Sequence, residues 1–251
     1  MEPYEQEALR LDVYLTLRGY FESRSRAVTA ITQGRIAVNG TVVAKNSYPV
    51  LPNDAVSIIA DSSLDQYVSR GALKLEKALA DFKLDITGFT ALDMGSSTGG
   101  FTDCLLQHGA STVFAVDVGT QQMHPKLRND TRVKLFENQD IRTFTSEQCF
   151  DIVTGDLSFI SLHHILPLIP AFLKPTGISI LLIKPQFEVG SKHISKKGIV
   201  KNENETLRVK ETLRQKALNL GLKTIGITPV PIIEVEKNKE YLWLLKFEIS
   251  K

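Results

Sequence analysis

A glycine-rich stretch directly after an apolar run most limits what this chain can fold into. It reads Ala91-Leu-Asp-Met-Gly-Ser-Ser-Thr-Gly-Gly-Phe-Thr-Asp103. The apolar residues up to Met94 suit a buried strand, while glycine lets a backbone turn with positive φ and approach a ligand closely. The pattern predicts a strand, a tight loop and a helix, with a small-molecule site at the carboxyl end of the strand.

The glycine spacing separates this loop from phosphate-binding loops. It is G-x-x-x-G-G, whereas dinucleotide loops read G-x-G-x-x-G and phosphate loops end in Gly-Lys-Ser/Thr. Asp93, directly before the first glycine, would repel phosphates and suits a ligand with a cationic amine or sulfonium. The alternative is a glycine turn without a ligand. The loop residues that we count as ligand-binding are Gly95, Ser96, Thr98, Gly99 and Gly100.

Strands and helices alternate after this loop, which predicts a doubly wound, mainly parallel sheet. The expected strands are 112–117, 133–136, 151–156 and 178–183, helices are expected at 69–82, 162–173 and 203–220, and strands near 223–227 and 241–247 would form a hairpin-like final pair. Asp117 and Asp140 follow the second and third strands, where acidic side chains meet the ribose and adenine of nucleotide-like cofactors.

Length and composition allow one large domain, or a large domain with a small appendage. The 251 residues are 43% hydrophobic, enough for a sizeable core. The net charge of +2 is too small by itself to indicate nucleic-acid binding. Cys104 and Cys149 form no metal-ligand pattern, so we expect reduced thiols and no metal site. Without a signal-like or membrane-spanning apolar run, the expected location is cytoplasmic, with no membrane partner.

The first sixty residues form a separate pattern of helix, helix and hairpin, with a boundary near residue 62 that gives domains 1–62 and 63–251. Ser23 is placed to cap the second helix, and Asn39-Gly40 is typical of a type I′ turn. The basic side chains in this stretch are Arg18, Arg24, Arg26 and Arg35. They would contact RNA phosphates or form an ordinary solvated helix face.

The order of three segments in this region resembles the S4 RNA-binding domain. The segments are Arg10-Leu-Asp-Val-Tyr-Leu, Ser23-Arg-Ser-Arg-Ala and Gly34-Arg-Ile-Ala-Val-Asn-Gly. The resemblance implies a small α+β domain in which Arg24, Arg26 and Arg35 contact the RNA backbone.

The rest of the chain resembles the Rossmann-like class I fold of S-adenosylmethionine-dependent methyltransferases. The resemblance rests on the glycine loop together with acidic ends on the first three strands. It implies that S-adenosylmethionine is the cofactor and that Asp93, Asp117 and Asp140 line its site with the glycines.

Four polar residues stand where strands or helices end: Lys74, Asp156, Lys184 and Glu240. Taken singly, each could be a surface salt-bridge partner. Two lysines in one partly buried site repel each other, which would lower the pKa of one and supply a neutral amine as a base. The set resembles the Lys-Asp-Lys-Glu tetrad of FtsJ-type ribose 2′-O-methyltransferases, and all four positions occur in the expected order.

Nearly the whole chain resembles the TlyA family, historically labelled hemolysin A. The resemblance adds Asp156-Leu-Ser-Phe-Ile-Ser-Leu and Lys184-Pro-Gln-Phe-Glu to the segments above. It implies 2′-O-methylation of cytidine in bacterial ribosomal RNA, on the large and in some members also the small subunit. Two departures are Met94 and Gly119-Thr-Gln-Gln-Met, the second near the expected cofactor ribose.

Several alternatives stay open at this stage. Base C5 methylation needs a cysteine in the cleft, where neither Cys104 nor Cys149 is expected. Amine methylation commonly uses a turn with two prolines, which Asp156-Leu-Ser-Phe159 lacks. A membrane-active hemolysin and a non-catalytic RNA-binding factor are the other classes. The basic segment 190–201 would be a mobile loop over the substrate or an ordinary solvated loop.

Overall fold

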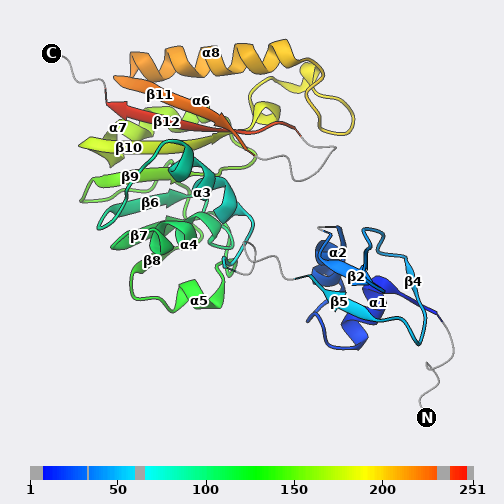
Figure 1. The fold of residues 1–251 in the computed structure, drawn as a ribbon. Helices are drawn as coiled ribbons and strands as arrows, with labels where there is room; N and C mark the ends of the chain where they lie inside the picture. The colour runs from blue at the N-terminus through cyan, green and yellow to red at the C-terminus, as the bar shows by residue number, and fades with distance from the viewer. Residues whose placement is uncertain (1–7, 33, 60–65, 231–237, 248–251) are drawn as a thin grey trace. The chain divides into compact units, whose positions relative to one another are not determined.

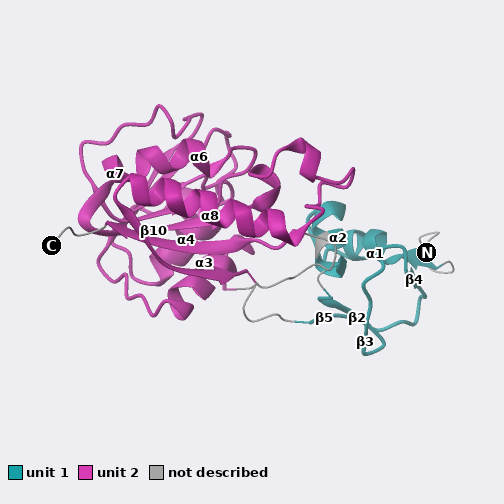
Figure 2. Cartoon of the chain, turned by 90° about the horizontal axis from the view of Figure 1, so that it is seen from above, with its two compact units in different colours: residues 1–65 teal, residues 66–251 magenta. Residues whose placement is uncertain are grey.

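The computed structural model describes residues 8–32, 34–59, 66–230 and 238–247. The chain divides into two compact units, residues 1–65 and 66–251, which Figure 2 colours separately. Within the described ranges, no helix has the length and apolar character needed to cross a membrane.

The small unit is α+β, as the resemblance to an S4 domain implies. Its elements are β1 (Leu9–Arg10), α1 (Leu11–Leu17), α2 (Arg24–Thr32), β2 (Ile36–Val38), β3 (Thr41–Val42), β4 (Pro49–Val50) and β5 (Val56–Ile58). Ser23 Oγ accepts the backbone N–H of Arg26, the capping contact that its position predicts. Asn39 and Gly40 both have positive φ, as a type I′ turn requires.

The large unit contains a seven-stranded sheet in the order β11-β12-β10-β9-β6-β7-β8, which Figure 1 shows from top to bottom. Strands β8, β7, β6, β9 and β10 are parallel, and β12 pairs antiparallel with β10 and β11. The strands are β6 (Thr90–Met94), β7 (Thr112–Val116), β8 (Val133–Phe136), β9 (Phe150–Gly155), β10 (Leu173–Ile183), β11 (Leu222–Pro229) and β12 (Tyr241–Phe247). The predicted mainly parallel sheet with a final antiparallel pair is confirmed.

Helices cover both faces of this sheet because alternate residues of each strand face opposite ways. Ala91 on β6 packs with α3 (Gly71–Asp81) and α4 (Gly100–Gln107), whereas Leu92 packs with α6 (Leu162–Ile165), α7 (Ile169–Phe172) and α8 (Glu203–Asn219). The short α5 (Pro125–Arg128) adds Leu127 to the first cluster. Since both faces are buried, the sheet edge with the strand carboxyl ends is the place for a ligand.

One predicted helix, over 162–173, is broken in the structure. It consists of α6, a 3-10 turn at Leu166–Leu168, and α7. Pro167 and Pro170 lack the N–H groups that a continuous helix would use, so the periodicity of the apolar residues misses this interruption.

Candidate active site

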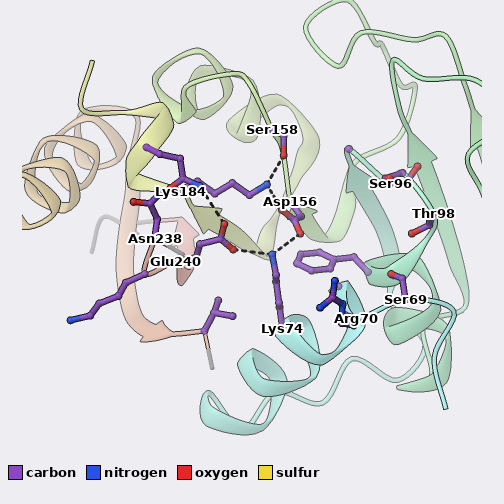
Figure 3. Close-up of a pocket in the computed structure, with 18 of the residues that line it drawn as sticks. Ser69, Arg70, Lys74, Ser96, Thr98, Asp156, Ser158, Lys184, Asn238 and Glu240 are labelled. Carbon is purple, nitrogen blue, oxygen red and sulfur yellow. Dashed lines mark hydrogen bonds and ion pairs between the residues drawn. The ribbon is translucent and has the colours of Figure 1, made fainter. Parts of the chain in front are cut away.

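A cavity of about 570 Å³ opens beside the glycine loop and the carboxyl end of β9. These two segments meet at the point where the strand order reverses, because β6 is followed along the chain by β7 on one side while β9 lies on its other side. Figure 3 shows Ser69, Ser96 and Thr98 toward one side of the cavity and Lys184, Asn238 and Glu240 toward the other. We call these the glycine-loop side and the lysine side.

The glycine loop needs glycine for two different reasons. Gly99 has φ 93°, in the left-handed region, and it directly precedes α4. A Cβ on Gly100 would collide with Ser69 Oγ and would be tightly crowded by the backbone N of Ala72. The loop is therefore packed against the start of α3, and Ser69 and Gly71 line the cavity with Gly95, Ser96, Thr98 and Gly100.

Asp93 does not face the cavity, contrary to our expectation of a direct ligand contact. Its side chain is fully buried on the α4 face of β6, where Thr102 Oγ1 and Thr154 Oγ1 donate hydrogen bonds to it at 2.7 and 3.2 Å. Burial raises the pKa of Asp93 to about 6, and the two hydroxyl donors only partly offset this effect. Asp93 thus ties β6 to α4 and β9 beneath the loop.

Asp117 and Asp140 follow β7 and β8 as predicted, but neither lines the cavity. Asp117 accepts the backbone N–H groups of Ser97 and Gly119, at 2.8 and 2.7 Å, and so orders the glycine loop. The Asp140 carboxylate is held by the Arg142 guanidinium and backbone N–H. This partner was not anticipated from the sequence, and it competes with the adenine contact that we expected of Asp140.

The four residues of the expected tetrad meet on the lysine side of the cavity. Lys184 Nζ lies 2.6 Å from Asp156 Oδ1, and Lys74 Nζ lies 3.3 Å from Asp156 Oδ2 and 2.9 Å from Glu240 Oε2. The side chains come from α3 and from the ends of β9, β10 and β12, so only the sheet topology brings them together. Lys184 is the most enclosed of the four, with a side chain that is 9% exposed.

The pKa of Lys74 is raised, whereas repulsion between two lysines was expected to lower the pKa of one of them. Desolvation lowers the Lys74 pKa, but Asp156 and Glu240 outweigh it, so that the pKa is raised above 10.5. Desolvation likewise opposes ionisation of Asp156, yet Lys74 and Lys184 hold its pKa below 3.8. Lys74 therefore stays an ammonium ion and Asp156 a carboxylate, because attraction to carboxylates exceeds the lysine–lysine repulsion considered from the sequence.

Three further residues around the tetrad were missed by reasoning from the sequence. Lys184 Nζ donates to Ser158 Oγ at 2.7 Å, and Gln186 Nε2 donates weakly to Glu240 Oε1 at 3.5 Å. Phe159 is 90% exposed, has φ 64° and packs against Phe187 with ring centroids 5.3 Å apart. All three lie within the segments Asp156-Leu-Ser-Phe and Lys184-Pro-Gln-Phe. The sequence indicated these segments as family motifs, but it did not indicate what each residue in them contacts.

The arginines of the small unit have different surroundings. Arg24 Nε contacts the buried Asp12 carboxylate at 2.8 Å, so this residue also stabilises the unit. Arg26 pairs with Glu22 on the surface, and Arg18 lies over the Tyr14 ring at 5.7 Å. Arg35 is half-buried directly before β2. Arg24 and Arg26 keep side chains that are 59% and 62% exposed, which leaves both accessible to a ligand.

Comparisons with known proteins give the same division of the chain. Residues 67–247 match the FtsJ-like methyltransferases and residues 9–56 match the S4 domain. A Brachyspira hyodysenteriae protein named hemolysin A is 38% identical over 93% of this chain and 98% of its own length. The Mycobacterium tuberculosis 16S/23S rRNA (cytidine-2′-O)-methyltransferase TlyA is 37% identical over 94% of this chain and 89% of its own.

The fold also matches a solved structure. A Streptococcus thermophilus protein described as a candidate hemolysin superposes with a TM-score of 0.75 and is 37% identical. The match covers 98% of this chain and 90% of that one. It includes both units, so the combination of the two domains is shared.

Proposed function

The chain belongs to the TlyA (hemolysin A) family of FtsJ-like methyltransferases that carry an S4 domain, and we propose that it methylates the ribose 2′-hydroxyl of a cytidine in ribosomal RNA with S-adenosylmethionine as the donor. The family resemblance predicted from the sequence is confirmed by these matches. The acceptor is proposed from the printed activity of the relatives and from the chemistry of the lysine side.

The glycine-loop side of the cavity fits the proposed donor. The whole cavity has a volume of about 570 Å³, in the range of cofactor sites, and Ser69, Ser96 and Thr98 line this side of it. No phosphate-binding Lys-Ser/Thr pair follows the glycines. When bound, S-adenosylmethionine supplies an electrophilic methyl group on a sulfonium sulfur.

The lysine side supplies the groups that a poorly acidic hydroxyl needs. Lys74 stays charged, as its raised pKa indicates, and it helps to keep Asp156 a carboxylate, whose pKa is lowered. Lys184 Nζ is held by Asp156 Oδ1 on one side, and it donates a hydrogen bond to Ser158 Oγ on the other. In our proposal Lys184 acts in its neutral amine form: its Nζ takes the proton of the attacking 2′-hydroxyl, Asp156 stabilises the ammonium that forms, and Glu240 balances the charge on Lys74.

The observation that carries this proposal is that the two Asp156 oxygens each contact a lysine in the cavity wall. Methylation of base C5 has no support from the cysteines. Burial raises the pKa of the Cys104 thiol, which lies in the core against α3, and Cys149 precedes the amino-terminal end of β9. Amine methylation needs no strong base, so a lysine–carboxylate cluster favours a hydroxyl acceptor.

We propose two RNA-contacting features in addition to this chemistry, one in each unit. Phe159, next to Ser158 at the cavity, presents an exposed ring on which a nucleobase can stack. The small unit carries Arg24 and Arg26, whose exposed guanidinium groups suit RNA phosphates.

Mass-spectrometric mapping of ribosomal RNA tests the proposed function. Cells that lack the protein are complemented with the wild-type chain, with Lys184→Ala, or with Lys192→Ala as a control on an exposed lysine. We expect a 2′-O-methylcytidine that the wild type and the control restore and that Lys184→Ala does not, since a general base contributes about a hundredfold or more. If ribosomal RNA from cells with and without the wild-type chain carries the same 2′-O-methylations, the proposal is wrong.

A further inference from the structure

The basic segment that the sequence left undecided forms a small hairpin at the lysine side of the cavity. Ile194 and Val200 form an antiparallel bridge, and Ser195 N–H donates to Ile199 O at 2.7 Å. The turn closes where Gly198 N–H donates to Ser195 O at 2.9 Å, and Gly198 has φ 79°. Lys196 and Lys197 occupy the two central positions of this turn.

The two lysines of the turn differ in where they lie. Both are exposed, but only Lys197 lines the cavity, together with Ile199. A hairpin directs neighbouring side chains to different sides, and the backbone of this one is held by several internal hydrogen bonds. Of these two neighbouring lysines, the structure places Lys197 at the cavity and Lys196 away from it.

Asn238 attaches this hairpin to the catalytic cluster. Its Oδ1 accepts the Val200 N–H at 2.8 Å, and its Nδ2 donates to Gly198 O at 2.9 Å. One side chain thus binds both a donor and an acceptor on the returning half of the hairpin. Asn238 stands two residues before Glu240 and itself lines the cavity, and Figure 3 shows its side chain beside Lys184 and Glu240.

The chemistry of the acceptor explains why a cation is needed at this wall. In RNA the 2′-oxygen and the 3′-phosphate are attached to neighbouring carbons of one ribose. An enzyme that presents a 2′-hydroxyl to Lys184 must therefore also receive a negatively charged phosphate close to Asp156 and Glu240, which would repel it. A lysine at the rim, with three rotatable donors and a compact charge, offsets that repulsion without reading the base.

We propose that Lys197 binds a phosphate of the RNA strand next to the acceptor ribose, and that Asn238 is the positioning residue that holds the 194–200 hairpin, and with it Lys197, at the cavity. This inference rests on the proposed RNA acceptor. It assigns to the hairpin a role in placing substrate and none in the transfer step itself.

The test uses the full-length chain and initial rates of methyl transfer from labelled S-adenosylmethionine. The acceptors are ribosomal subunits isolated from cells that lack the protein. The variants are Lys197→Ala, Asn238→Ala, the double variant, and Lys196→Ala as the matched control from the same turn. Calorimetric binding of S-adenosylmethionine and thermal unfolding check that each variant keeps its fold and donor site.

We expect Lys197→Ala to raise KM for the subunits about tenfold at unchanged kcat, as loss of one hydrogen bond to a charged group does. The slope of log kcat/KM against log salt should fall in size by about 0.7, the value for one phosphate contact on a single strand. Lys196→Ala should stay within about twofold of the wild type. Asn238→Ala should reproduce the rise in KM, and the double variant should add nothing further, because Asn238 acts through Lys197.

Three outcomes would overturn the inference. They are an unchanged KM in Lys197→Ala, an equal rise in KM in Lys196→Ala and Lys197→Ala, or a rise in KM in the double variant that equals the product of the two single rises. If the wild-type chain transfers no methyl group to either subunit, the proposed acceptor is wrong. The proposed phosphate contact of Lys197 is then tested by binding of a 20-nucleotide single-stranded RNA, and equal salt slopes for the wild type and Lys197→Ala would reject it as well.

Discussion

The ammonium group of Lys74 lies 2.9 Å from Glu240 Oε2, and this ion pair joins α3 to the residue that precedes β12. The same ammonium contacts Asp156 at 3.3 Å. Two carboxylates therefore share one lysine, and their attraction keeps its pKa raised despite desolvation. The charge state of Lys74 therefore depends on both Asp156 and Glu240.

Replacement of Glu240 by Gln should lower methyl transfer while leaving donor binding intact. The substitution removes one of the two charges that stabilise the Lys74 ammonium, and a hydrogen bond to a charged group contributes enough for about a tenfold loss in kcat. Single-turnover rates and calorimetric binding of S-adenosylmethionine separate the two effects. Glu211→Gln is the control, because Glu211 is an exposed residue of α8 that contacts Gln215. Equal single-turnover rates for Glu240→Gln and the wild type would remove Glu240 from the mechanism.

Asp93 should make the large unit less stable as the pH rises from about 4 to 6. Its pKa is about 6 in the folded chain and near 3.9 in an unfolded one, so between these values the folded state holds the extra proton. Stability from this group is complete below pH 4 and is lost by about pH 6, a difference on the order of 3 kcal/mol.

Urea unfolding of the wild type and Asp93→Asn across pH 4 to 7 measures this effect. The variant has no proton to lose, and its amide can still accept from one threonine hydroxyl and donate to the other. The difference in unfolding free energy between the two proteins should shift in favour of Asp93→Asn as the pH rises. A pH-independent difference would show that Asp93 titrates alike in both states.

Arg24 and Arg26 should separate RNA binding from stability. Arg26→Gln breaks a surface ion pair with Glu22, so it should leave the melting temperature unchanged. It should weaken RNA binding, and the slope of log K against log salt should become smaller by the amount expected for about one phosphate contact. Arg24→Gln should weaken binding and also destabilise the small unit, because Asp12 is 1% exposed and, among the residues that the structure describes, would then be left with Arg10 as its ion-pair partner. If neither variant changes the salt slope, these arginines do not contact RNA.

Phe159→Ala should raise KM for the RNA substrate about tenfold without affecting donor binding. Stacking of a base on an aromatic ring contributes about 1–3 kcal/mol, and Phe159, which directly follows the cavity-lining Ser158, is 90% exposed. Phe159→Tyr keeps the ring and should retain wild-type KM, whereas Phe159→Leu should behave like the alanine variant. Wild-type KM in Phe159→Leu would mean that the ring makes no stacking contact.

Much of the fold was accessible from local patterns. The apolar run, the glycines and the alternation of strands and helices predicted the parallel sheet and the loop, because period and turn chemistry are written in neighbouring residues. The interruption at Pro167 and Pro170 was missed because the apolar spacing continues through it. The position of β12 between β10 and β11 depends on long-range pairing that no local pattern contains.

The sequence by itself determined which residues are available to the site: a glycine loop, the four polar residues of the tetrad and a basic segment. Tertiary structure decided which of these act on the cavity. It buried Asp93 between Thr102 and Thr154, paired Asp140 with Arg142, and placed Lys197 rather than Lys196 at the rim. The physical reason is that charge and burial depend on partners far apart in the chain, as in the contact of Lys74 with Glu240, which only the assembled sheet brings within reach.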